Sequence, residues 1–230
     1  LLRRNQLVFP AYSDGPRYGD RVWDLSSLSK HMSEANKSID FRTVPENYRT
    51  TIKDVLVLLA QPDHSALYRS GVVRRTTTPP PKLIDSFYLL RNAARWSREH
   101  GITDFQSWDQ EVADDYLDAL QHGRHKVNGV ALAPGTIRKH LDALYLLREL
   151  APALPDGGFD FVPWTGRTSN TVAKGGRDSE NRTQPLRWET WSPLVAGAYS
   201  IIRDFSPDIL ESIRIRNSLP KSPRGMSGNA

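Results

Sequence analysis

The chain has 230 residues, 38% hydrophobic and 25% charged, which is enough apolar material for one large or two small cores. A net charge of +5 and a pI of about 9.5 favour polyanionic partners weakly. The absence of Cys excludes disulfides and thiolate chemistry. No apolar run is long enough to cross a membrane, and the first residues lack the apolar stretch of a signal peptide. We therefore expect a cytoplasmic protein with no membrane partner.

Residues 1–76 predict an N-terminal segment that contains one helix. Residues 1–42 are rich in Ser, Asp, Gly and Arg, and we expect them to be mostly irregular, with Trp23 and Leu25 as anchors. The chain shows no convincing strand pattern and no internal repeat. The sequence therefore predicts a mainly α protein.

The helix of this segment is predicted from a capping signal and a period. Thr43 and Glu46 have capping-box spacing, and apolar residues then recur at helical intervals as far as Leu59. We expect this helix to end before Pro62. Residues 61–81 contain three consecutive Thr and three consecutive Pro, which predict an extended linker.

Residues 77–155 predict a compact bundle of three to four helices. The first helix has an apolar face that begins at Leu83, and Gly101 closes it. A capping box that begins at Ser107 opens the second helix, whose outer side carries five acidic residues. The third helix opens at Pro134 and ends before two further prolines.

Residues 156–186 predict a basic linker, and residues 187–230 the start of another domain. Apolar residues from Trp188 to Phe205 have helical spacing, with Pro193 either as the first helical residue or as a kink. If this helix folds without the rest of a domain, its Trp and Ile side chains are exposed, which predicts poor solubility or docking onto the middle bundle.

Basic residues suggest a polyanion-binding surface. On the first helix of the bundle, Arg91, Arg95 and Arg98 form a stripe of guanidinium groups, which suit phosphate oxygens and guanine edges. The third helix offers its N-terminus to anions. An ordinary salt-bridged helix surface gives a similar pattern. The remaining candidate DNA contacts are Thr136, Arg138 and Lys139 at the start of the third helix, and Arg167, Lys174, Arg177 and Arg182 in the linker.

Other polar groups point to no chemistry. The acidic face of the second helix lacks the glycine and ligand spacing of a calcium loop, and phosphates would repel it. His122 and His125 lack the further ligands that zinc requires, and His140 is expected to be a structural histidine. No Gly-rich phosphate loop or nucleophile elbow is present. We therefore assign no catalytic residue, metal or cofactor.

Several phrases together resemble the N-terminal core-binding domain of phage-type integrases, the tyrosine recombinases, in their actinobacterial form. The phrases most typical of it are WSREHGI at residues 96–102 and PGTIRKHLDAL at 134–144. Residues 83–88, 107–108, 164–167, 180–183 and 205–210 add to the likeness, which covers most of residues 20–210. Its motifs are core and capping patterns rather than catalytic signatures.

The resemblance implies a small helical, SAM-like core-binding domain that clamps double-stranded DNA, followed by a catalytic domain with a Tyr nucleophile and no metal. This sequence has no His-x-x-Arg motif, and its last tyrosine, Tyr199, falls in the first predicted helix of that domain. We therefore expect a truncated integrase that binds DNA, with possible self-association on it, but is inactive as a strand-transferase. A frameshift in the gene of a complete recombinase is one origin of such a truncation. The alternative is a helical protein–protein interaction module with no DNA role.

Overall fold

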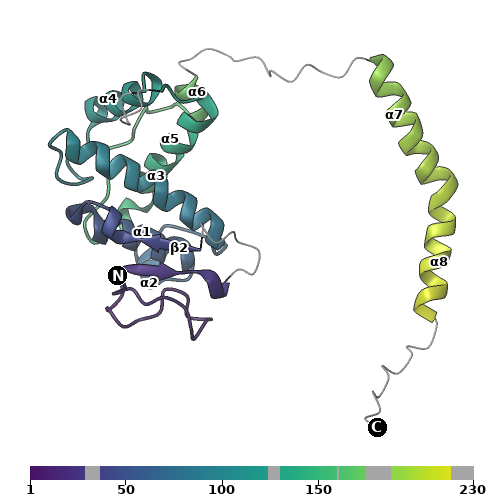
Figure 1. Cartoon of the computed structure of the whole chain (residues 1–230), viewed down its shortest axis with the longest axis horizontal. Coiled ribbons are helices and arrows are strands. Elements are labelled where there is room, and N and C mark those ends of the chain that lie inside the picture. Colours follow the sequence, from purple (N-terminus) through teal and green to yellow (C-terminus); the bar gives the residue numbers. More distant parts are fainter. Residues whose placement is uncertain (29–36, 124–129, 160, 175–187, 219–230) are drawn as a thin grey trace, which may run out of the picture. The chain divides into compact units, whose positions relative to one another are not determined.

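The computed structural model describes residues 1–28, 37–123, 130–159, 161–174 and 188–218. These residues are mainly helical, so the predicted fold class is confirmed (Figure 1). The chain divides into two compact units, Leu1–Asp178 and Ser179–Ala230. Each unit is described by itself.

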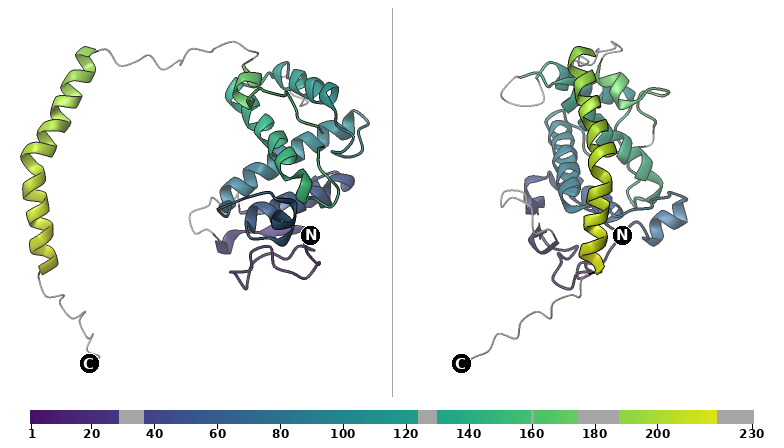
Figure 2. Two further views of the ribbon diagram at one scale, coloured as in Figure 1. Left: turned by 180° about the vertical axis from the view of Figure 1, so that it is seen from behind. Right: turned by 90° about the vertical axis from the view of Figure 1, so that its right-hand side faces the viewer.

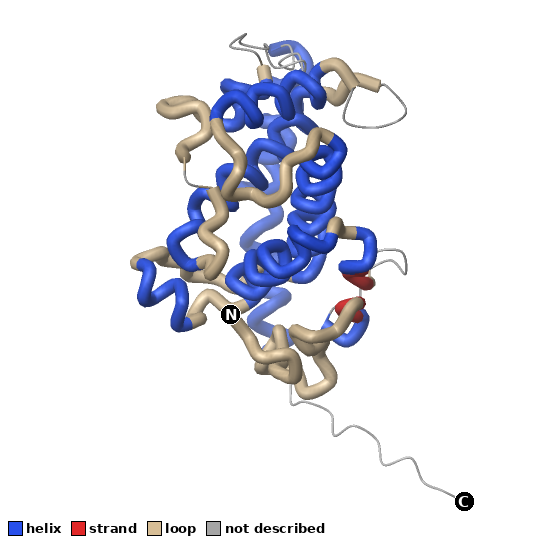
Figure 3. Tube along the Cα trace, turned by 90° about the vertical axis from the view of Figure 1, so that its left-hand side faces the viewer, coloured by secondary structure: helices blue, strands red, loops and turns tan. Residues whose placement is uncertain are grey.

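The first unit combines a short hairpin with six helices among its described residues (Figure 3). A single-turn 3-10 helix, Phe41–Thr43, follows the second strand, and another, Glu46–Tyr48, precedes α1. The named elements are β1 (Val22–Asp24), β2 (Ser38–Asp40), α1 (Arg49–Ala60), α2 (Ser65–Ser70), α3 (Pro80–Glu99), α4 (Gln110–Gln121), α5 (Pro134–Leu150) and α6 (Ser169–Ala173).

Strands β1 and β2 pair antiparallel, with Trp23 opposite Ile39. Both side chains are buried, and the Trp23 ring meets the Phe41 ring edge-on at 4.7 Å between centroids. Trp23 and Leu25 are therefore the anchors that the sequence predicted. The described part of residues 1–42 is mostly irregular, as predicted, but the expectation of no strand was wrong. Two three-residue strands that are 13 residues apart leave no run long enough to show alternation.

The start of α1 differs from the prediction. Thr43 does not cap the helix; its hydroxyl donates to the Asp40 carbonyl at 2.7 Å. Instead α1 begins at Arg49, and no side chain caps its N-terminus. The helix ends at Ala60, so the predicted end before Pro62 is confirmed.

The predicted linker 61–81 holds two helical segments. The His64 imidazole accepts a hydrogen bond from the Ala66 N–H at 3.2 Å and caps α2, which ends at Gly71 with a φ of +73°. Pro80 opens α3 rather than extending the linker. Proline is favoured in a first helical turn because its missing N–H would have no partner there.

The cap of α4 lies two residues after the predicted one. The Asp109 carboxylate accepts from the Val112 N–H at 2.9 Å, whereas the Ser107 hydroxyl donates to Asp104 Oδ1 at 2.8 Å. Helix α5 opens at Pro134 as predicted, and the left-handed Gly101, with a φ of +76°, follows the end of α3.

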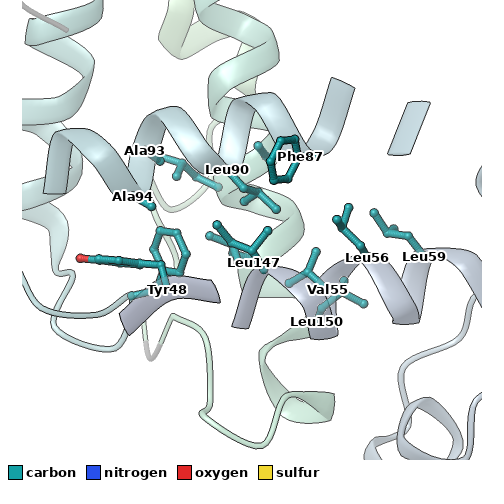
Figure 4. Close-up of a cluster of buried hydrophobic side chains, with 14 of the residues drawn as sticks. Tyr48, Val55, Leu56, Leu59, Phe87, Leu90, Ala93, Ala94, Leu147 and Leu150 are labelled. Carbon is teal, nitrogen blue, oxygen red and sulfur yellow. The ribbon is translucent and has the colours of Figure 1, made fainter. Parts of the chain in front are cut away.

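One core joins the N-terminal segment to the bundle. Helices α1, α3 and α5 pack against one another (Figure 2). In Figure 4, Leu56 and Leu59 of α1 lie below Phe87 and Leu90 of α3, with Leu147 of α5 beside them. The predicted boundary at residues 76 and 77 therefore does not separate two compact units.

An aromatic cluster closes the other end of the bundle. The Trp108 ring stacks on Phe159 at 5.4 Å and meets Tyr116 edge-on at 5.5 Å, while Trp96 lies 5.1 Å from Tyr116. The segment after α5 thus returns to the bundle. In this segment, the Trp164 indole Nε1 donates to the Asp114 carboxylate of α4 at 2.7 Å. The described part of the predicted linker 156–186 is therefore packed against the bundle.

The second unit is described over residues 188–218. Helix α7 (Trp188–Ser200) continues through a π-helical turn, Ile201–Phe205, into α8 (Ser206–Ser218). Pro193 lies inside α7 rather than at its start. No side chain of these helices is buried, and Trp188, Trp191 and Ile202 are 70%, 49% and 65% exposed.

Candidate nucleic-acid interface

The stripe predicted on α3 is present, and its first member is held against aromatic rings. The Arg91 guanidinium lies 4.7 Å from the Tyr88 ring centroid and 5.8 Å from that of Phe87. Burial lowers the pKa of Arg91, and the nearby Arg95 charge lowers it further. Its Nε is buried without a hydrogen-bond partner among the described residues. Arg91 is therefore fixed in orientation and only partly satisfied.

Arg95 and Arg98 are exposed further along the same helix. Arg95 Nε donates to the Thr43 carbonyl at 3.1 Å, which ties the stripe to the 3-10 turn after β2. Within the described part of the chain, neither Arg95 nor Arg98 forms an ion pair with a carboxylate. Their charge is therefore available to an anion.

The residues predicted on α5 form a second group, with α6. Thr136, Arg138 and Lys139 are exposed in the first turns of α5. Arg138 Nε lies 3.9 Å from Asp142 Oδ2, and Asp142 also accepts a hydrogen bond from Ser169 at the start of α6. Arg138 therefore has the ordinary i, i+4 partner that the sequence offered as the alternative to DNA.

The predicted linker residues are only partly described. The Tyr145 hydroxyl of α5 donates to the Arg167 carbonyl at 2.9 Å, so the exposed Arg167 lies beside α5. Lys174 follows the last residue of α6. Arg177 and Arg182 lie outside the described residues. The described contacts thus place the candidates in two groups, one on α3 and one on α5 and α6.

Sequence reasoning missed cations that lie beside the α3 group. Arg49 Nε donates to the Val44 carbonyl at 3.0 Å, and Arg42 stands next to Thr43 in the chain. Arg95 reaches this same turn from α3. The i, i+4 spacing of Arg49 and Lys53 was the available signal, but the N-terminal segment was treated as separate from the bundle.

The acidic and histidine residues have structural partners. Asp114 on α4 accepts the Trp164 indole N–H, so this face is not purely solvated. His140 is buried and lies 2.8 Å from the Tyr116 hydroxyl, which confirms its structural role. His122 Nδ1 lies 2.8 Å from an Asp118 oxygen. Among the described residues, no cluster of His, Asp and Glu has the arrangement of a metal site.

Comparisons with protein-family models, with curated proteins and with solved structures returned no match to this chain. In the described parts of the chain, every helix is too short or too polar to cross a lipid bilayer.

Proposed function

We propose that the chain is a cytoplasmic double-stranded DNA-binding protein of site-specific recombination, with no strand-transfer chemistry of its own. The observation that supports this most directly is the pair of exposed arginines, Arg95 and Arg98, without carboxylate partners on α3. The sequence resemblance to tyrosine recombinases supplies the process.

Binding would rest on phosphate charge. Arginine presents a planar fork of donors to phosphate oxygens, and each neutralised phosphate releases counterions. Arg91, packed on Tyr88, would lose little side-chain entropy on binding. The group on α5 and α6 would add contacts through Lys139 and Arg167, which have no carboxylate partner within the described residues.

The test replaces Arg95 with Glu and follows duplex binding by mobility shift at several salt concentrations. Losing one phosphate contact should weaken binding and reduce the slope of log affinity against log salt by about one unit. Arg75→Glu is the matched control, because Arg75 is exposed and lies outside both groups. Equal effects of the two substitutions would mean that only net charge matters, and unchanged binding by Arg95→Glu would remove the assignment.

The second candidate is a helical protein–protein interaction module with no DNA role. The unburied apolar side chains of α7 and α8 favour it. Affinity for random duplex DNA at low salt separates the two functions, because an interaction module should show none. Self-association on DNA, which belongs to the first candidate, would appear as a stoichiometry above one chain per short duplex.

A further inference from the structure

A cleft of about 520 Å³ opens in the first unit, where residues 4, 18–21 and 41–42 face the first turns of α1. Its volume is within the range of about 300–1,000 Å³ that is usual for small-molecule sites. None of the three α3 arginines lines the cleft, although Arg95 bonds the Thr43 carbonyl next to its lining residue Arg42. Five of the side chains that line it are cationic, namely Arg4, Arg21, Arg42, Arg49 and Lys53.

Lys53 is held at this cleft by its surroundings. Its Nζ donates to the Tyr18 and Asp20 carbonyls at 2.7 Å each and lies 4.8 Å from the Phe41 ring centroid. The two carbonyls and the rings of Tyr18, Trp23 and Phe41 fix the ammonium group, so Lys53 contributes its charge to the cleft. Burial lowers the pKa of Lys53; the Arg49 and Arg4 charges also lower it, whereas Asp20 and Asp54 raise it.

The charges that line the cleft are poorly balanced. None of the side chains that line it is a carboxylate. Asp40 neutralises Arg42 through a contact of 2.7 Å. In the described part of the chain, Arg4, Arg21 and Arg49 form no ion pair. A bound anion would therefore relieve repulsion among cations that the fold has brought together from three segments.

The geometry favours a compact polyvalent anion. Arg49, Thr50 and Lys53 belong to the first turns of α1, where the helix dipole favours negative charge. Gly19 permits the close approach of the turn that contains Arg4, because a Cβ there would lie 2.7 Å from the Arg4 carbonyl oxygen. Several donors converging on one space suit the tetrahedral oxygens of a phosphate better than a single carboxylate.

We propose that this cleft binds a phosphate group. The group is carried either by a nucleic-acid backbone or by a free phosphate ester. This site does not depend on DNA binding by the α3 arginines.

The experiment titrates the whole chain with inorganic phosphate and follows backbone amide shifts by NMR. Residues 18–21, 41–43 and 49–53 should shift together. Arg21→Gln, at an exposed side chain, and Arg49→Gln should each weaken phosphate binding about tenfold, as expected for loss of a charge-assisted hydrogen bond. Arg75→Gln should leave it unchanged. No shift at these residues, or equal affinity in all three variants, would overturn the proposal.

Two arms identify the source of the phosphate. Short duplex DNA is added to the phosphate-loaded protein, both in the original chain and in Arg95→Glu. In the original chain, displacement of phosphate by bound duplex assigns the cleft to the nucleic-acid backbone, and retention of phosphate while duplex is bound assigns it to a free phosphate ester. Loss of duplex binding in Arg95→Glu with phosphate binding intact concerns the α3 stripe alone, so the two proposals fail separately.

Discussion

The indole N–H of Trp108 shows how much one polar atom in this core depends on its partner. Trp108 Nε1 donates to Ser97 Oγ at 3.0 Å, and that hydroxyl donates to the Ala93 carbonyl at 2.9 Å. Both side chains are buried, at 2% and 0% exposure. The phrase WSREHGI thus contains a core contact that fixes α3 to the start of α4.

Replacing Ser97 with Ala should lower the free energy of unfolding by about 1–3 kcal/mol, because the indole N–H is left without a partner in the core. Urea denaturation of both proteins measures this change in the free energy of unfolding. Ser86→Ala is the matched control, since Ser86 makes the same backward bond on the exposed side of α3, to the Lys82 carbonyl at 2.9 Å. Its effect should stay within about 0.5 kcal/mol. If the control is equally destabilising, the lost Trp108 partner is not the cause.

Single residues were predictable where one strong preference decides their place. His140 was predicted as structural because it adjoins the apolar face of its helix, and it is buried beside Tyr116. The cap of α4 was not predictable in the same way. Ser107 and Asp109 are both good N-caps, and the choice depended on Asp104, which captures the Ser107 hydroxyl.

Long helices could be predicted from the periodicity of their apolar residues, whereas short elements could not. The main spans of α1, α3, α4 and α5 were predicted because each repeats its apolar side chains over several turns. The hairpin of β1 and β2 depends on a pairing between distant residues, and α2 depends on a histidine cap. The basic cleft combines both problems, since its cations come from separate segments that only the fold brings together.

The packing of α1 predicts that the bundle cannot stand alone. Helix α1 packs against α3, and Leu56 and Leu59 lie on the side of α1 that is turned toward Phe87 (Figure 4). Removing residues 1–76 would expose the facing side of α3 to water, which costs about 25 cal/mol of free energy for each Å² of apolar surface. Residues 77–178 should therefore lack the cooperative thermal unfolding of residues 1–178, as measured by circular dichroism. Cooperative unfolding of the shorter chain at the same midpoint would show that the core closes without α1.

At the scale of the whole molecule, the two units differ in how far they bury their apolar side chains. The buried hydrophobic residues of the described chain all fall between Val8 and Ala173. The helix predicted from Trp188 to Phe205 is present, and the described helical residues continue to Ser218 with their apolar side chains exposed. Its seam repeats at alternating intervals of three and four, which is the spacing of a coiled coil. The seam comprises Trp188, Trp191, Val195, Ala198, Ile202, Phe205 and Ile209.

Removing residues 179–230 should therefore separate stability from association. The midpoint of thermal unfolding of residues 1–178 should match that of the first transition of the whole chain to within about 2 °C, because residues 188–218, the described part of the second unit, contribute no buried side chain. The whole chain should associate as concentration rises, since the exposed apolar side chains of α7 and α8 favour contact with another surface. Sedimentation velocity over a range of concentrations measures this. Ile202→Lys in the whole chain should also suppress association, whereas Arg203→Lys, which keeps the charge, should not. If the shortened chain associates as strongly as the whole chain, the contact between copies lies on the exposed basic and apolar surfaces of the first unit. The seam of α7 and α8 would then not cause the association.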